Sequence, residues 1–285
     1  MNQPLAADSQ PHLSPEDLRW FCEFLYNRTG MMFGESKRYY IERRLYERLA
    51  VTASPTFASY FVRLRADPLE AAEVTDAFTV NETYFYREDH QFRCLSQNLL
   101  PEITRAKGPG DKIRIWSQPC STGEEAYSIA IWLLENWPMV DAYNVEILGS
   151  DIDATVLAAA RLGRYGERSL ARLPAPVAEA YFEPAQNGVR AIIDDLRESI
   201  SLNEANLIDR ASMTANGQFE VIFCRNVLIY FDDDARARAA DNLYACLAPG
   251  GFLCLGHSES MARIDARFQL RRFADAIVYQ RPERG

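Results

Sequence analysis

The chain has 285 residues, enough for one large domain or two of ordinary size, and its hydrophobic content of 48% supports a sizeable core. Its formal net charge of −9 and pI near 5.0 argue against non-specific nucleic-acid binding, which depends on cationic groups that neutralise phosphates. No apolar run approaches the length of a membrane span, and residues 1–10 are too polar for a signal peptide, so we expect a soluble cytoplasmic protein.

Six cysteines and three histidines are spread through the chain without a C-x-x-C pair or a cluster with the spacing of metal ligands. Disulfides are rare in reducing compartments, and structural zinc sites need closely spaced Cys and His ligands. We therefore predict buried free thiols and no bound metal.

The first eighty residues have the pattern of a small all-helical domain. Residues 14–17, SPED, combine an N-cap serine, a proline at the first helical position and carboxylates in the first turn. Gly30 ends the apolar pattern that follows. Further helices are predicted at 36–49, from a second start signal at Ser54-Pro55, and at 68–78.

The predicted helix at 36–49 carries a basic cluster that stands out in an acidic chain. Its members are Lys37, Arg38, Arg43, Arg44 and Arg48. One interpretation, which composition favours, is a solvated face on which Glu42 and Glu47 pair with basic neighbours about one turn away. The other is a docking surface for an acidic partner.

Residues 80–88, VNETYFYRE, break the helical pattern with a dense run of aromatic residues. Such a run fits a connector whose rings fill the seam between two domains. It also fits the rim of a binding site, because aromatic faces beside an arginine suit a cationic, planar ligand. Its position shortly before the next motif favours the second interpretation, and we place the domain boundary near 80–95.

Residues 112–134 have the pattern of a strand, a turn and a helix that opens at Glu124. Such a turn leaves free backbone N–H groups at the helix start, where nucleotide-handling folds bind a cofactor. Here Glu124 and Glu125 occupy the first turn, and no G-x-G-x-x-G is present. A phosphate-bearing ligand is therefore disfavoured, and a ligand that offers hydroxyls or a positive charge is favoured.

From residue 112 onward strands alternate with helices, which predicts an α/β fold with a parallel, doubly wound sheet and ligands at the carboxyl ends of its strands. The later strands are predicted at 145–148, 219–223, 252–255 and 276–280. Asp151 follows the second strand, where an acidic residue binds ribose hydroxyls in dinucleotide folds, and Asp153 is better placed to cap the next helix.

Between about 165 and 205 the alternation fails. Asn187-Gly188, with short apolar runs at 189–193 and 200–202, predicts a small β-excursion inserted into the domain.

Five stretches of the chain match a known family. They are N-E-T-Y-F-Y-R-E (81–88), W-S-Q-P-C-S-T-G-E-E-A-Y-S-I-A (116–130), S-D-I-D (150–153), F-C-R-N-V-L-I-Y-F-D (223–232) and L-G-H-S-E-S (255–260). On these motifs the chain resembles the bacterial chemotaxis receptor methyltransferases of the CheR type, which use S-adenosylmethionine to methylate glutamate side chains. The resemblance covers nearly the whole chain, and the last two motifs are its most specific part.

The resemblance implies a helical amino-terminal domain over 1–90 that docks the receptor. It also implies a Rossmann-like methyltransferase domain over 91–285, with an antiparallel β-subdomain at about 165–205. The implied reaction forms glutamate methyl esters on chemoreceptors for chemotactic adaptation, with S-adenosylhomocysteine as the product and no metal. The implied partners are the cytoplasmic methylation helices of the receptors, without nucleic acid or membrane insertion, and we expect a monomer.

The resemblance also places the family's cofactor contacts on nine residues. They are Asn81, Thr83, Arg87, Glu125, Asp151, Asn206, Leu207, Arg225 and Asn226. Arg87 and Tyr230 resemble the residues nearest the transferred methyl group, and we predict that they are catalytic. His257 could act as a base or position the backbone at a strand end.

Some members of the family dock on a pentapeptide at the receptor carboxyl terminus through a β-subdomain loop with a glycine-bearing insertion. The corresponding residues 183–193 are compact with a single glycine, so we expect a pentapeptide-independent enzyme. Two rival classes stay open: a non-catalytic adenosylmethionine-binding regulator, and a nucleic-acid methyltransferase. The acidic composition and the lack of an N-P-P-Y-like motif after the 219–223 strand argue against the second, and the missing glycine fingerprint argues against a dehydrogenase.

Overall fold

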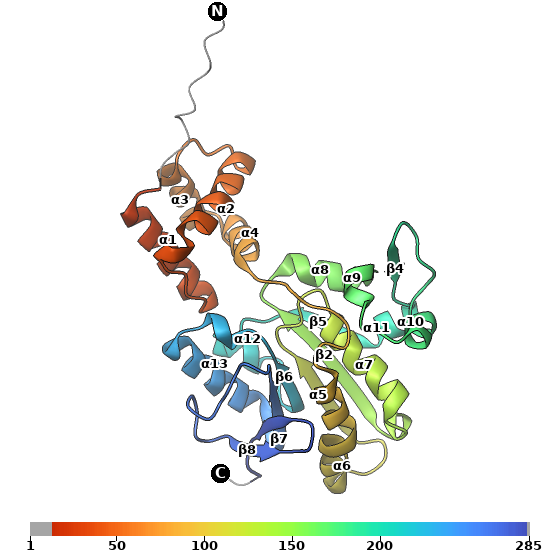
Figure 1. The fold of residues 1–285 in the computed structure, drawn as a ribbon. Helices are drawn as coiled ribbons and strands as arrows, with labels where there is room; N and C mark the ends of the chain where they lie inside the picture. Colours follow the sequence, from red (N-terminus) through yellow and green to blue (C-terminus); the bar gives the residue numbers. More distant parts are fainter. Residues whose placement is uncertain (1–12, 284–285) are drawn as a thin grey trace, which may run out of the picture. The chain divides into compact units, whose positions relative to one another are not determined.

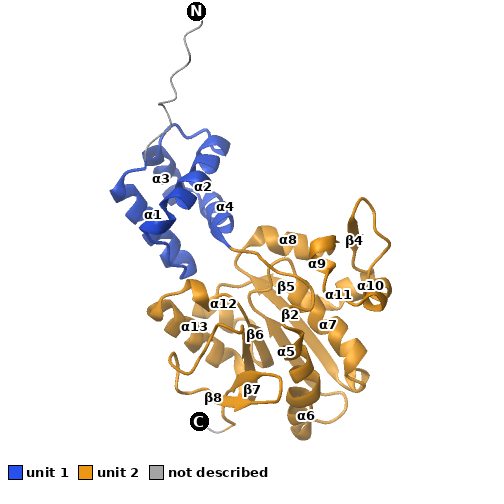
Figure 2. Ribbon diagram, in the orientation of Figure 1, with its two compact units in different colours: residues 1–79 blue, residues 80–285 orange. Residues whose placement is uncertain are grey.

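The computed structural model describes residues 13–283 (Figure 1). The chain divides into two compact units, residues 1–79 and residues 80–285 (Figure 2). Within the described residues, unit 1 is all-helical, and unit 2 is an α/β domain built on one large sheet.

Unit 1 contains the helices and the 3-10 turn α1 (Pro15–Thr29), η1 (Glu35–Lys37), α2 (Arg38–Val51), α3 (Phe57–Ala66) and α4 (Pro68–Phe78). The predicted start at Ser14 is confirmed, because its hydroxyl accepts a hydrogen bond from the Asp17 N–H at 3.0 Å. Gly30 ends α1 in the left-handed conformation, with φ of 73°.

The predicted helix start at Ser54-Pro55 is wrong. Helix α3 begins at Phe57, and Thr56 is its N-cap. The Thr56 side chain accepts from the Ser59 N–H at 3.2 Å, and the Ser59 hydroxyl accepts from the Thr56 N–H at 3.2 Å. This reciprocal capping box satisfies two backbone donors at once, which explains why the helix starts after the proline.

Three members of the basic cluster around α2 are used inside unit 1. Arg38 pairs with Glu42 at 2.9 Å one turn along the helix, and Arg48 pairs with Glu70 at 2.7 Å. The guanidinium of Arg44 lies over two aromatic rings. The first interpretation therefore holds for Arg38, whereas Arg48 pairs with a buried carboxylate of α4 and Arg44 packs on rings, so neither belongs to a solvated face paired with Glu42 or Glu47.

Lys37 and Arg43 differ from those three. Both side chains are exposed, and neither forms an ion pair with any residue between 13 and 283. Their charges are therefore available to an acidic partner, as the second interpretation of the cluster requires.

Unit 2 is built on a seven-stranded sheet with the order β5-β2-β1-β6-β7-β9-β8. Its strands are β1 (Lys112–Ser117), β2 (Asn144–Asp151), β5 (Ile200–Glu204), β6 (Phe219–Cys224), β7 (Leu247–Leu255), β8 (Gln269–Arg272) and β9 (Ile277–Gln280). The first five strands in this order are parallel, and β9 and β8 are antiparallel. The Rossmann-like α/β prediction is confirmed, although the sheet is mixed and β8 was not predicted.

Helices and helical turns precede and connect these strands. They are α5 (Asp89–Cys94), η2 (Leu95–Leu99), α6 (Leu100–Ile103), η3 (Thr104–Ala106), α7 (Glu124–Asn136), η4 (Val140–Ala142), α8 (Ala154–Leu162), α9 (Glu167–Leu170), α10 (Ala175–Tyr181), α11 (Asp194–Glu198), α12 (Arg210–Thr214), η5 (Leu228–Tyr230) and α13 (Asp233–Cys246). The helical stretch from Asp89 to Ala106 is interrupted by the π-helical turn η2. Pro101 explains the interruption, because it cannot donate to the carbonyl four residues earlier, inside that turn.

Both faces of the sheet are buried. Ile113 and Ile115 of β1 belong to the same core cluster as Ile129 of α7. Trp116 points to the opposite face, where its ring stacks on Phe219 at a centroid distance of 4.6 Å. This packing fixes β1 in the sheet, so that the loop after it starts from a rigid position.

The predicted β-excursion is a small antiparallel pair, β3 (Arg164–Gly166) with β4 (Val189–Ala191). Asn187 and Gly188 both have positive φ, 53° and 77°, as the predicted two-residue hairpin turn requires. The assignment of residues 200–202 to this excursion is wrong. They belong to β5, which pairs in parallel with β2 and forms an edge of the main sheet.

All six cysteines are unpaired, and five of them are buried. No helix among the described residues is long and apolar enough to cross a membrane.

Candidate functional site

The loop after β1 joins the ends of several strands. The Gln118 N–H donates to the Phe223 carbonyl at 2.8 Å, near the end of β6. The Gln118 side chain donates to the Ala205 carbonyl at 3.2 Å, just beyond β5. The loop contains a cis peptide bond before Pro119, and Gly123, with φ of 93°, is the N-cap of α7. The carboxyl ends of β1, β5 and β6 therefore meet around one loop.

The two carboxylates at the start of α7 have different environments. Glu124 is buried and accepts from the hydroxyls of Thr122 at 2.6 Å and Ser169 at 3.0 Å; burial raises its pKa. Glu125 accepts from the Ser117 hydroxyl at 2.7 Å, and its side chain is 13% exposed. Glu124 thus ties α7 to α9, and Glu125 is the carboxylate with access to a ligand.

Asp151 lies at the end of β2 and is almost completely buried. Its two carboxylate oxygens accept from the N–H groups of Ser121 at 2.8 Å and Asp153 at 3.1 Å. Burial raises the pKa of Asp151 to about 6, and the hydrogen bonds oppose this shift. A carboxylate has about four acceptor positions, so these backbone hydrogen bonds leave acceptor capacity for a ligand hydroxyl. Asp153 caps α8 through the Val156 N–H at 3.0 Å, as predicted.

The aromatic segment of residues 80–88 packs into unit 2 instead of filling a seam between two domains. Phe85 is fully buried, with its ring edge-on to Tyr165 at 4.8 Å, so part of the segment fills the core of unit 2. Asn81 donates to Asp153 at 3.0 Å, which brings the start of the segment to the end of β2. Thr83 is half-buried between them. The segment also borders a hollow of about 370 Å³, but Tyr84, Tyr86 and Glu88, which line it there, are not predicted site residues, so the interpretation as a rim stays a prediction.

The side chain of Arg87 lies on the same segment. Its guanidinium donates to the Glu82 carbonyl at 2.7 Å and lies 5.8 Å from the centroid of the Tyr84 ring. Two residues in this stretch, Tyr86 and Glu88, have positive φ, 58° and 55°. Non-glycine residues rarely adopt this conformation, and such residues cluster at functional sites.

Arg225, directly after β6, is enclosed by acidic groups. Its guanidinium forms ion pairs with Glu125 at 2.8 Å and Glu88 at 3.2 Å and donates to the Arg87 carbonyl at 2.7 Å. Its side chain is 2% exposed. Arg225 therefore holds Glu125 and the 80–88 segment together, and a direct contact with a cofactor remains a prediction.

Asn226 and Tyr230 lie on the loop that follows. Asn226 has a left-handed backbone with φ of 61°, and Tyr230 ends the 3-10 turn η5. The carboxylate of Glu259 accepts from backbone N–H groups of this loop. No local signal in the L-G-H-S-E-S motif singles out Glu259 as the acceptor for a loop 33 residues away. His257 instead pairs with Glu88 at 2.9 Å, so Glu259 fills the backbone-positioning role considered for His257.

Asn206 and Leu207 follow β5. The Asn206 side-chain oxygen accepts from the Ile208 N–H at 3.2 Å, and the Leu207 carbonyl accepts from Asn242 at 2.9 Å. The Ala205 N–H donates to the Asp151 carbonyl at 3.0 Å, which places the pair beside the end of β2. The predicted site residues thus lie on the 80–88 segment, in the first turn of α7, at the end of β2, and on the segments that follow β5 and β6.

The donor set of these loops fits S-adenosylmethionine. Glu125 and Asp151 offer carboxylates to an ammonium or sulfonium cation and to a ribose diol, and Asn81, Asn206 and Asn226 add amide groups. No glycine-rich phosphate cradle is present at the start of α7, where the carboxylates disfavour phosphate. Among residues 13–283, no group of three or more His, Cys, Asp or Glu side chains is arranged to hold a metal ion.

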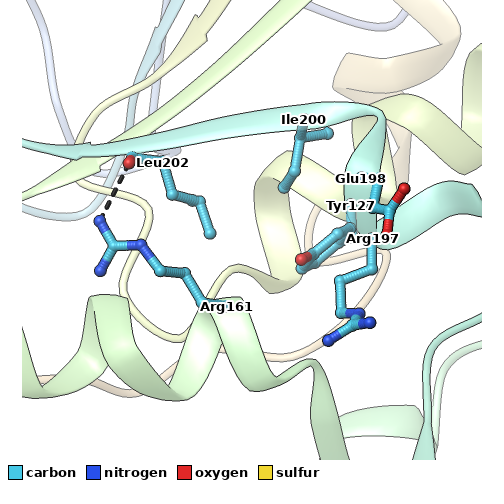
Figure 3. A pocket seen from close by; sticks show the side chains of 6 residues that line it. All are labelled: Tyr127, Arg161, Arg197, Glu198, Ile200 and Leu202. Atoms are coloured by element: carbon cyan, nitrogen blue, oxygen red, sulfur yellow. Dashed lines mark hydrogen bonds between the residues drawn. The ribbon is translucent and has the colours of Figure 1, made fainter. Parts of the chain in front are cut away.

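A separate pocket of about 300 Å³ is lined by Tyr127, Arg161, Arg197, Glu198, Ile200 and Leu202 (Figure 3). Arg161 donates to the Leu202 carbonyl at 3.0 Å across it. None of the six lining residues is a predicted site residue, so this pocket is distinct from the candidate site.

Comparisons with known family models cover both units of the chain. The family model of the CheR methyltransferase SAM-binding domain matches residues 81–277, and that of the CheR methyltransferase all-alpha domain matches residues 16–79.

Two curated relatives are similar over most of the chain. "Chemotaxis protein methyltransferase 2" of Vibrio cholerae is 43% identical over 275 residues, 96% of this chain and 95% of that protein. The protein of the same name from Pseudomonas aeruginosa is 36% identical over 260 residues, 90% of this chain and 91% of that protein. Among solved structures, the rRNA methyltransferase aviRa from Streptomyces viridochromogenes matches 71% of this chain and 86% of that one. Its TM-score of 0.42 and identity of 13% are too low to support an argument about function.

Proposed function

Because the chain belongs to the CheR family of S-adenosylmethionine-dependent methyltransferases, we propose that it methylates glutamate side chains of chemotaxis receptors. The product is a glutamate methyl ester, and the physiological role is adaptation of the receptor. The observation that carries the proposal is a pair of carboxylates: Asp151 at the end of β2, and Glu125 in the first turn of α7, which Arg225 links to the segment that carries Arg87.

The reaction needs little acid–base chemistry from the protein. A glutamate has a pKa of about 4.3 in water, so the nucleophile is already ionised at neutral pH. When bound, S-adenosylmethionine supplies a methyl group on a positively charged sulfur that a carboxylate oxygen can attack directly. The protein's contribution is alignment and the removal of water, and orientation of two bound reactants can supply roughly 7–11 kcal/mol.

In this proposal each site residue has a separate role in binding the cofactor or aligning the substrate. Asp151 accepts the ribose hydroxyls, Glu125 faces the cationic end of the cofactor, and Arg225 keeps Glu125 in place. The remaining contacts come from Asn81, Thr83, Asn206, Leu207 and Asn226. Arg87 and Tyr230 hold the incoming carboxylate in line with the methyl group, Arg87 through its charge and Tyr230 through its hydroxyl.

The receptor is the protein partner in this proposal. Its cytoplasmic methylation helices carry the glutamates, and an acidic helix is complementary to the exposed charges of Lys37 and Arg43 on unit 1. The enzyme acts on them in the cytoplasm as a monomer, without metal or nucleic acid.

The β-subdomain supports independence from a receptor pentapeptide. The turn at Asn187-Gly188 is closed by two hydrogen bonds between Gln186 and Val189, at 2.8 and 3.1 Å. A two-residue turn leaves no inserted loop to bind a peptide. Calorimetry with an isolated receptor tail peptide should therefore show no binding, and micromolar binding would refute this part of the proposal.

The main test uses labelled S-adenosylmethionine and a panel of receptor signalling domains. We expect label on the receptor that is released as methanol by mild alkali, because methyl esters hydrolyse and methylated amines do not. Receptor variants with Gln for Glu at the methylated positions are the control and should accept no label. Binding of the cofactor without transfer to any receptor would favour a regulator, and transfer to RNA or DNA would favour a nucleic-acid methyltransferase.

A further inference from the structure

Glu259 is the acceptor for an unusual number of backbone donors. Its Oε1 accepts from the N–H groups of Val227 at 2.9 Å and Leu228 at 2.7 Å. Its Oε2 accepts from the N–H groups of Asn226 at 2.7 Å and Gly256 at 2.8 Å. Three of these donors belong to the loop after β6, and the fourth lies at the end of β7. One carboxylate therefore joins the ends of two adjacent parallel strands.

The loop that Glu259 holds has no regular structure of its own to fix it. Asn226 is in the left-handed conformation, which costs free energy for a non-glycine residue. The following turn η5 is only three residues long and has no side-chain cap at its N-cap, Val227. Without an acceptor, the N–H groups at the start of this turn would be unpaired in a half-buried position. Glu259 supplies that acceptor, together with a negative charge where the donors converge.

The approach of Glu259 depends on Gly256. A Cβ atom at position 256 would lie 2.8 Å from Glu259 Oε2 and 3.0 Å from the Asn226 nitrogen. The Glu259 N–H also donates to the Gly256 carbonyl at 2.9 Å, which closes a turn that directs the carboxylate back toward the loop. The motif at 255–260 thus combines a glycine that leaves room with a carboxylate that fills it.

We propose that Glu259 is a positioning residue for methyl transfer: it fixes the loop from Asn226 to Tyr230, so that the Tyr230 hydroxyl is held where the incoming carboxylate binds. This inference rests on the proposed function, in which Tyr230 acts in the transition state. A glutamine cannot replace Glu259, because its amide nitrogen would face two of the four N–H donors. An aspartate keeps the charge but is one methylene too short to reach all four.

The first test compares steady-state kinetics of the wild type, Glu259→Gln and Glu259→Asp with a receptor substrate. A displacement of about 1 Å at a reacting group can cost about 10²-fold in rate. We expect Glu259→Gln to lower kcat by about that factor, with a much smaller change in KM for the receptor, and Glu259→Asp to fall in between. Glu179→Gln, an exposed glutamate on α10, is the matched control and should keep the wild-type kcat.

A second measurement separates positioning from simple stabilisation of the fold. In the Tyr230→Phe background, Glu259→Gln should cause only a small further loss of kcat, because the hydroxyl that it positions is already absent. The loss of thermal stability should be the same in both backgrounds. Equal losses of kcat in both backgrounds, or a wild-type kcat in folded Glu259→Gln, would overturn the proposal. If Glu259→Gln does not fold, the same cycle is run with Glu259→Asp.

The loop can also be followed without any methyl transfer. Hydrogen exchange at the amides of Val227 and Leu228 should accelerate in Glu259→Gln and stay unchanged in Glu179→Gln. If the wild type methylates no receptor, the proposed function fails whatever the exchange shows. If the wild type is active but these amides exchange equally in both variants, only the role of Glu259 fails.

Discussion

Each unit of the molecule contains an arginine–carboxylate network, and the two networks are built in opposite ways. In unit 1 the carboxylate is central: Glu70 accepts from Arg48 at 3.0 and 2.7 Å and from the Tyr60 hydroxyl at 2.7 Å. In unit 2 the arginine is central: Arg225 is 2% exposed and lies between Glu125 and Glu88, each 13% exposed.

This difference indicates that the network in unit 1 stabilises the fold, whereas the network in unit 2 can also bind a ligand. Glu70 is enclosed by its own donors, and its hydrogen bonds with Arg48 and Tyr60 hold its pKa below the usual value despite burial. In unit 2 the enclosed group is the cation, and the carboxylates around it keep part of their surface accessible. A buried arginine that presents Glu125 outward suits a cationic cofactor, whereas the enclosed Glu70 has nothing left to offer a ligand.

Replacing the arginine of each network should have the largest effect and separate their roles. Removing one partner of a buried pair costs about 3–5 kcal/mol of stability, because the remaining charge is left uncompensated. We expect Arg48→Met and Arg225→Met both to lower the unfolding midpoint in urea. Only Arg225→Met should also abolish S-adenosylhomocysteine binding by calorimetry.

The proposed difference between the two networks is wrong if Arg48→Met loses affinity for S-adenosylhomocysteine to the same extent as Arg225→Met. It is also wrong if Arg225→Met binds S-adenosylhomocysteine with the wild-type affinity. Arg63→Met is the control for unit 1. Arg63 is 46% exposed and lies 3.7 Å from Asp67, a geometry that contributes little to stability.

Tyr230→Phe removes one hydroxyl from the turn η5, which follows Arg225 in the chain, without removing a charge. If that hydroxyl aligns the attacking carboxylate in the transition state, kcat should fall by about 10²–10³-fold with cofactor affinity unchanged. Single-turnover transfer to a receptor fragment measures this directly. Tyr181→Phe, which removes a hydroxyl on α10 that bonds to Glu135, should be neutral. Wild-type turnover in Tyr230→Phe would exclude its hydroxyl from the mechanism.

The sequence predicted the parts of this site that depend on local chemistry. Asp151 ends a strand, and Glu125 lies in the first turn of the helix that follows another strand, so both lie toward the carboxyl edge of a parallel sheet. Asp153 was separable from Asp151 because the N-cap position is defined by the helix that follows. The π-helical turn before Pro101 was not predicted, although the proline marks the place.

The parts that were missed depend on contacts between distant segments. Glu259 acts on a loop 33 residues away, and Glu88 meets Arg225 and His257 only when the 80–88 segment packs against the ends of β6 and β7. Residues 200–202 were assigned to the wrong sheet because a short apolar run does not specify its partner. The spacing of apolar residues along the sequence does not specify these contacts between distant segments.

Asp151 should make cofactor binding depend on pH. Its pKa of about 6 means that acidification protonates it well above the usual range of an aspartate. Hydroxyl donors favour the ionised form, so affinity should be constant above pH 6 and weaken by up to about tenfold per pH unit below it. Asp151→Asn should bind about 10–100-fold more weakly at pH 7.5, the equivalent of one or two hydrogen bonds to a charged group, and lose this dependence.

The raised pKa of Asp151 changes folding stability with pH in the direction opposite to its effect on cofactor affinity. Because the pKa of Asp151 is higher in the folded protein, its contribution favours folding most at low pH and is lost as pH rises through about 6. Asp151→Asn should therefore be at least as stable as the wild type at pH 7.5 in urea. Unchanged cofactor affinity in Asp151→Asn would show that the ribose assignment is wrong.

The smallest effect is expected at the exposed end of the basic cluster in unit 1. Lys37→Glu and Arg43→Glu should each raise KM for a receptor fragment roughly fivefold at low salt, because exposed charges steer association without forming enclosed pairs. The effect should shrink as ionic strength rises, since the Debye length falls to about 8 Å at 0.15 M. Cofactor affinity should not change, because it depends on the network around Arg225 in unit 2. Arg19→Glu on α1 changes net charge by the same amount, and an equal rise in KM there would show that the cluster has no special role.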